Sequence, residues 1–185
     1  RVELATRTLR DLETATARDE RERVASEAMT ERLGPEVEMN EAGLDVGLNV
    51  LASPWHSTRE VYDLMPTDTE EHWSNVASRL HDLPKAVDGY RRTLEAEIAS
   101  GRPPARRQVV AVVPQIHRAA GGFFTDLVAP APDNLRAELD AGVAAATASY
   151  EEFARYLTED VLPRARAHDA VGRHVYAISS RYFLG

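Results

Sequence analysis

The densest group of side chains that could do chemistry lies near the C-terminus. It combines two cations, an imidazole and two phenols: Arg173, His174, Tyr176, Arg181 and Tyr182. Arginine binds anions through charge-assisted hydrogen bonds, and histidine or tyrosine can donate a proton. We therefore regard these residues as candidates for binding an anionic substrate. The alternative interpretation is an ordinary surface of a helical bundle with two packed tyrosines.

The histidines do not have the spacing of the common zinc-enzyme motif. In that motif, H-E-x-x-H, two imidazoles one helical turn apart face the same metal ion. No two histidines of this chain are three or four positions apart; they are His56, His72, His81, His117, His168 and His174. The sequence also lacks Cys, a G-x-S-x-G turn and a glycine-rich phosphate loop. It therefore predicts no catalytic residue, no metal ligand and no cofactor in this chain.

Length and composition predict one helical domain, residues 1–185. A chain of 185 residues can bury enough surface for a core without disulfides. The net charge of −8 comes from acidic and basic residues mixed along the same segments, which argues against a nucleic-acid partner. No apolar run approaches the roughly 20 residues of a membrane span, so we expect no membrane partner. The compartment stays open, with the cytoplasm favoured for a soluble chain.

A long helix over residues 67–100 organises the predicted fold. Thr67 and Glu70 have the spacing of a capping box, and Gly101 with the prolines that follow marks the end. Pro84 inside it predicts a kink. Apolar side chains recur every three or four residues, which is typical of a helix packed lengthwise in a bundle. We call this set the seam: Trp73, Val76, Leu80, Leu83, Val87, Tyr90 and Leu94.

The remaining segments also favour helices. Residues 2–33 are predicted to form a first helix with a charged middle, followed by an irregular connection near residues 34–53. The helix after Pro104 should be kinked at Pro114 and broken at residues 121–122. Residues 135–161 have a second long apolar period, which predicts an antiparallel partner for residues 67–100. The predicted fold class is all-α, a bundle of long, partly kinked antiparallel helices.

Several segments together carry a resemblance to a known family. They are LNVLASPWHSTREVYDLMP, EEHWSNVASRLHDLPKAVDGYRRTLEAEIASG, PPARRQVVAVVPQI and VGRHVYAISSRYFLG. In this order they resemble the N-terminal half of the bacterial domain-of-unknown-function family 885 (DUF885). The resemblance implies a large, mostly helical protein similar to zinc carboxypeptidases of the gluzincin type, whose zinc motif lies in a C-terminal half. It transfers no metal ligand onto any position of this chain.

Two functions follow as expectations. The first is an N-terminal helical scaffold fragment of a metal-dependent, peptidase-like hydrolase, inactive alone, with zinc bound only in the full-length parent. Its partner would be the missing C-terminal half, and apolar surface exposed without that half should drive self-association. The second is a self-contained helical module for protein–protein interaction without enzymatic activity.

Overall fold

The protein is helical throughout the part that the computed structural model describes, residues 2–184, and no strand occurs in that range. One isolated bridge joins Ala105 to Arg166. The all-α class is therefore confirmed. The chain divides into two compact units: a first unit made of residues up to Val46 and from Ala170 onward, and a second unit, Gly47–Asp169.

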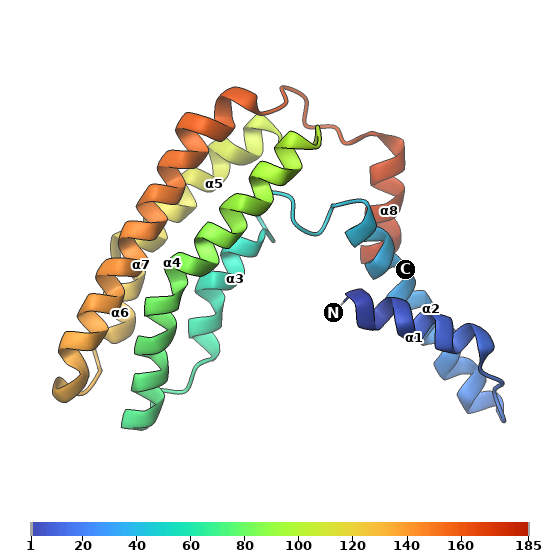
Figure 1. Ribbon diagram of the computed structural model, residues 1–185, viewed down its shortest axis with the longest axis horizontal. Helices are drawn as coiled ribbons and strands as arrows, with labels where there is room; N and C mark the ends of the chain where they lie inside the picture. The colour runs from blue at the N-terminus through green and yellow to red at the C-terminus, as the bar shows by residue number, and fades with distance from the viewer. Residues whose placement is uncertain (1, 185) are drawn as a thin grey trace. The chain divides into compact units, whose positions relative to one another are not determined.

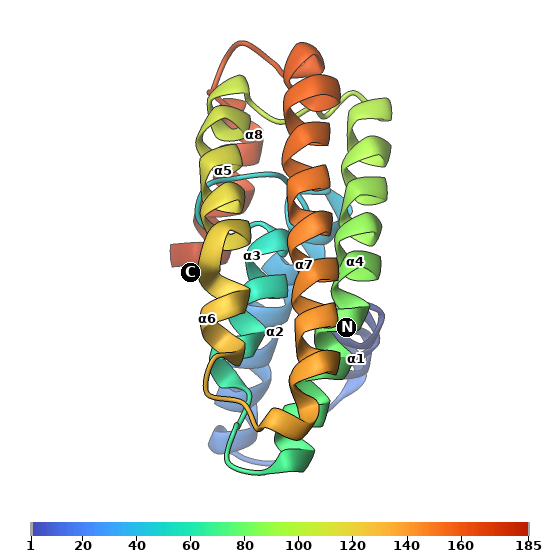
Figure 2. The same cartoon turned by 90° about the vertical axis from the view of Figure 1, so that its left-hand side faces the viewer.

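The second unit contains the larger core and is built from four helical limbs (Figure 1). The first three limbs are α3 (Pro54–Glu60) with the 3-10 turn η1 (Val61–Leu64), α4 (Glu70–Ala99), and α5 (Arg106–Arg118) with α6 (Phe124–Val128). The last limb is α7 (Arg136–Tyr156), which follows the turn η3 (Asp133–Leu135) and continues through η4 (Leu157–Val161) and η5 (Leu162–Arg164). Figure 2 shows α7 between α4 and the limb formed by α5 and α6.

Helices α4 and α7 pack along each other, as the two long apolar periods predict, but they run parallel. Gly142 early in α7 approaches Leu80 in the first half of α4, and Tyr156 at the end of α7 bonds Glu95 near the end of α4. The antiparallel pairing predicted for these two helices is therefore wrong. The physical reason is that the limb of α5 and α6, which follows α4 in the sequence, runs back along the bundle before α7 begins. Both α4 and α7 therefore point the same way (Figure 1).

The predicted seam of α4 is confirmed, because all seven of its side chains are buried. The helix begins two residues later than expected: Thr69, not Thr67, is the N-cap and accepts from the His72 N–H. Pro84 lies inside the continuous helix. Gly101, with φ of +83°, follows the last turn, as glycine commonly does.

The limb of α5 and α6 stays helical where the sequence predicted a break. The segment η2 (Ala119–Phe123) is a π-helical turn that contains Gly121 and Gly122 and leads directly into α6. Each hydrogen bond of a π turn spans five residues instead of the four of an α-helix, and such turns occur inside α-helices. The helix therefore continues through the two glycines. The predicted break at these glycines is therefore wrong.

The irregular connection is shorter than predicted and covers residues 42–53. Helix α2 (Glu20–Glu41) runs through Pro35, and it ends where Gly43 adopts φ of +67° and donates to Asn40. Beyond it, the Val50 N–H donates to Gln108 of α5, and Gln115 Nε2 donates back to the Val50 carbonyl. These bonds hold the connection against α5.

The first unit consists of α1 (Val2–Thr14), α2 and α8 (Gly172–Leu184), with α1 and α8 both packed against α2. The single helix predicted for residues 2–33 is wrong, because Asp19 caps α2 by accepting from the Glu22 N–H. Few side chains of this unit are buried. Those that are include Ala5, Met39 and Ile178.

Candidate functional site

The residues predicted for substrate binding all lie on α8. Arg173, His174 and Tyr176 are exposed. Arg181 Nη1 donates to Glu38 Oε2 of α2 at 2.8 Å, and Tyr182 makes an edge contact with the neighbouring Phe183. Of the five, only Arg181 therefore has a polar partner from another helix in the contacts of the described chain, and the substrate-binding role stays a prediction.

A groove of about 730 Å³ lies within the second unit, between the limb of α3 and η1 and the helix α4. Its volume falls in the range of small-molecule sites, about 300–1,000 Å³. The α3 and η1 side contributes Thr58, Val61, Tyr62 and Met65, and the α4 side contributes His72, Asn75, Ser78, Arg79, Asp82 and Ala86. We call it the α3–α4 groove.

Helical periodicity explains why these side chains line one groove. Asn75, Arg79 and Asp82 are spaced by four and three residues, so they share one face of α4 beside the buried seam. Tyr62 reaches the groove because the chain tightens into a 3-10 turn after Glu60. The groove is therefore lined by one face of α4 and by the limb of α3 and η1 that packs beside it.

Tyr62 is the buried polar residue of the groove. It is only 2% exposed, and its ring makes edge contacts with Phe124 and Phe123, with centroids 5.8 and 6.4 Å away. Its hydroxyl is buried and has no hydrogen-bond partner in the described chain. Burial raises the pKa of the Tyr62 phenol well above its usual range, so the hydroxyl keeps its proton. The wall of the groove therefore includes a buried hydrogen-bond donor without an acceptor.

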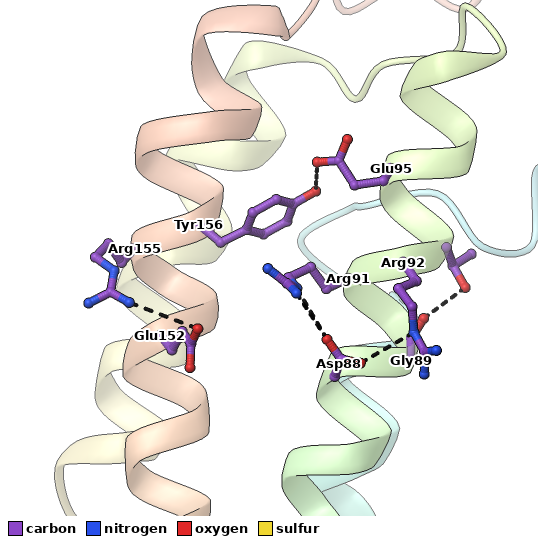
Figure 3. A network of polar contacts seen from close by, with 9 residues as sticks. Asp88, Gly89, Arg91, Arg92, Glu95, Glu152, Arg155 and Tyr156 are labelled. Atoms are coloured by element: carbon purple, nitrogen blue, oxygen red, sulfur yellow. Dashed lines mark hydrogen bonds and ion pairs between the residues drawn. The ribbon is translucent and has the colours of Figure 1, made fainter.

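A second polar cluster lies where the C-terminal ends of α4 and α7 are in contact. Glu95 accepts from the Tyr156 hydroxyl at 2.6 Å (Figure 3) and from both terminal nitrogens of Arg164 at 2.6 and 2.9 Å. Arg91 lies over the Tyr156 ring, 5.7 Å from its centroid. Hydrogen bonds lower the pKa of Glu95 to about 2, and the bond from Arg164 has a larger effect than the bond from Tyr156. The cluster joins α4 to the C-terminal end of the α7 limb.

Acid should weaken this cluster. Glu95 has a pKa of about 2 in the folded chain and 4.5 ordinarily, so it stabilises the fold above pH 4.5, and this contribution is lost as the pH falls towards 2. Because the side chain is 42% exposed, we expect less than about 1 kcal/mol. Urea unfolding between these pH values should show a smaller loss of stability in Glu95→Gln than in the wild type.

The control for this measurement is Glu152→Gln. Glu152 is an exposed carboxylate of α7 that approaches Arg155 only to 3.9 Å. This variant should keep the wild-type dependence on pH. If Glu95→Gln and the wild type lost stability in parallel, the cluster would contribute nothing to the fold.

Within residues 2–184, no group of three or more His, Cys, Asp and Glu side chains has the arrangement of a metal site. In the same range, no helix is both long and apolar enough to cross a membrane. Two expectations stay predictions: that zinc is bound only in the full-length parent, and that the partners are the missing C-terminal half and other copies of this chain.

Comparison with known proteins bears on the family. The model of the family described as "Bacterial protein of unknown function (DUF885)" matches residues 1–185. The chain belongs to this family. A search of the curated proteins found no match. DUF885 membership confirms the family part of the resemblance; the similarity to zinc carboxypeptidases is a separate question.

Sequence reasoning did not find the groove of this DUF885 chain. Tyr62 and Arg79 come from different helices and belong to no motif. The available signal was the helical spacing of Asn75, Arg79 and Asp82 directly beside the seam of α4. Such spacing is also typical of a solvated helix face, so residue types alone do not distinguish the two.

Proposed function

We propose that this chain is the helical scaffold beside the cleft of a metal-dependent, peptidase-like hydrolase and is inactive alone. The resemblance described above supports the class of enzyme. Three of its four segments fold as α3 with η1, α4 and α5, which are consecutive limbs of the second unit. The scaffold would present these limbs to catalytic groups contributed from outside residues 1–185.

The observation that carries the scaffold role is the use of polar side chains to join helices. Tyr156 and Arg164 both donate hydrogen bonds to Glu95, and the Tyr150 hydroxyl lies 2.7 Å from Thr58 Oγ1. Burial raises the pKa of Tyr150 to about 12, which makes it a poor proton donor at neutral pH. These phenols therefore serve packing, as a scaffold requires.

The test compares this chain with its parent protein. Purified protein of residues 1–185 should neither bind zinc stoichiometrically nor hydrolyse peptides, and the parent should do both through an H-E-x-x-H helix that follows in the gene. Stoichiometric zinc and peptide cleavage by residues 1–185 alone would show that the scaffold proposal is wrong.

The second candidate function, a helical interaction module, is favoured by the first unit. Leu4, Val24 and Met29 of α1 and α2 are 57%, 51% and 44% exposed, and little of this unit is buried. A binding surface would require these exposed apolar side chains to form one contiguous patch, which is what the interaction module proposes. A stop codon soon after Gly185 would favour this candidate over the scaffold.

Self-association is the prediction that follows from the missing C-terminal half, and the exposed apolar side chains of the first unit are where we expect it to occur. Light scattering should give a dimer or a larger assembly, and Val24→Lys should shift it towards the monomer because a charge would be buried at the contact. Leu64→Lys is the matched control, since Leu64 is 85% exposed on the second unit and should leave the assembly unchanged. A strictly monomeric wild type at high concentration would contradict the prediction.

A further inference from the structure

We propose that the α3–α4 groove binds a small amphipathic carboxylate, that is, one carboxylate group joined to an apolar chain. This goes beyond the scaffold role, because it assigns a ligand to the second unit itself. The proposal rests on the donors that face the groove, on the charges beside them and on the apolar wall.

The buried hydroxyl of Tyr62 requires an acceptor. A buried hydroxyl without a hydrogen bond destabilises the fold, and the Tyr62 hydroxyl has no partner in the described chain. The Thr58 hydroxyl nearby is already engaged with Tyr150 and with the Trp55 carbonyl. A ligand oxygen that reaches this hydroxyl through the groove wall would supply the missing acceptor. Buried polar atoms elsewhere also lack partners, but their residues do not line the groove.

Arg79 supplies the positive charge for that oxygen. Arg79 and Tyr62 both line the groove, Arg79 from the α4 side and Tyr62 from the side of η1. Within residues 2–184, neither Arg79 nor Asp82 forms an ion pair, although Asp88 on the same helix pairs with two arginines. Asn75 and Ser78 add an amide and a hydroxyl on the same wall. This set of donors suits a carboxylate, which accepts several hydrogen bonds at once.

Asp82 favours a single negative charge over a double one. It lies one helical turn from Arg79 on the groove wall and would repel an anion bound there. A phosphate monoester carries about −1.5 to −2 charges at neutral pH, so it is repelled more than a carboxylate with one charge. The wall therefore selects against phosphate.

The rest of the wall suits an apolar chain. Val61 and Met65 on one side and Leu83 and Ala86 on the other line the groove next to the polar set. Each methylene of a ligand that leaves water on this wall makes binding more favourable. The polar set would hold the carboxylate, and these side chains would hold the chain attached to it.

The test is a calorimetric titration of the full chain with decanoate. We expect saturable binding with one site per chain. Tyr62→Phe removes only the hydroxyl and should weaken decanoate by about tenfold without loss of fold, since that hydroxyl is unpartnered. Arg79→Gln should weaken decanoate by a similar factor, and Asp82→Asn should strengthen it. Lys85→Gln is the matched control, because it removes a cation of α4 that does not line the groove.

Two relatives of decanoate complete the test: decanol, which has no charge, and decyl phosphate, which is close to doubly charged. Decanol and decyl phosphate should both bind more weakly than decanoate. The proposal is overturned if decanoate does not saturate, or if decanol binds as tightly. It is also overturned if Tyr62→Phe and Arg79→Gln bind decanoate like the wild type, because the acid would then occupy another apolar surface.

Discussion

Replacing Phe124 with alanine is expected to lower the free energy of unfolding of the second unit by about 3–5 kcal/mol. The Phe124 side chain is fully buried, and its ring makes edge contacts with Tyr62 of η1 and Tyr150 of α7, at 5.8 and 5.2 Å between centroids. One ring from α6 thus touches two other limbs. Truncation would leave a cavity at their junction that the surrounding helices cannot fill without moving.

Tryptophan fluorescence during urea unfolding can measure this loss for the second unit alone. The chain has two tryptophans, Trp55 and Trp73, and both are buried in that unit. The control is Phe183→Ala on α8, where the ring is 71% exposed, and we expect a change within about 0.5 kcal/mol. A loss below about 1 kcal/mol for Phe124→Ala would show that the three limbs do not meet at this ring.

The buried face of α4 could be predicted from sequence because one periodic signal determines it. A side chain that recurs every three or four residues returns to the same side of the helix, whatever packs against it. The seam from Trp73 to Leu94 was therefore correct in every position. The start at Thr69 was missed because Thr67 has a glutamate three residues later, the spacing of a capping box, whereas Thr69 has His72 at that position.

The direction of α7 relative to α4 could not be predicted in the same way. Apolar periodicity is the same for parallel and antiparallel neighbours, so direction depends on how often the chain reverses in between. The expected break at Gly121 and Gly122 concealed that α5, the π turn and α6 form one return limb. Glycine is a poor helix former, but here tertiary packing of Phe124 and Val128 keeps the segment helical.

The candidate site shows the limit of residue types more clearly. The group on α8 was found because its arginines and phenols are close in sequence, whereas Tyr62 and Arg79 are separated along the chain and line the groove from two different elements. Tyr62 is distinguished by two properties together, a buried hydroxyl without a partner and a place in the groove lining, and both are properties of the fold. Sequence spacing could identify the wall of α4 but not the groove that it lines.

Replacing Gly142 with alanine is expected to lower the free energy of unfolding by about 1–3 kcal/mol. A Cβ at this position would lie 2.8 Å from the Leu80 Cβ and 3.6 Å from the Ala77 carbonyl oxygen. Leu80 Cβ is fixed to its backbone, so relief requires α4 and α7 to separate. That separation would loosen the buried residues along both helices, and the loss should exceed the gain of about 1 kcal/mol in helix propensity.

Gly89→Ala is the matched control, because Gly89 is also a glycine within a long helix but has no atom within 4 Å of an added Cβ. There the same substitution should stabilise the second unit by about 0.5–1 kcal/mol through propensity alone. Opposite signs for the two variants, measured by urea unfolding, would demonstrate the close parallel approach of α4 and α7. If both variants were stabilised equally, Gly142 would not lie at a close contact, and the packing of these two helices would have to differ from the one described.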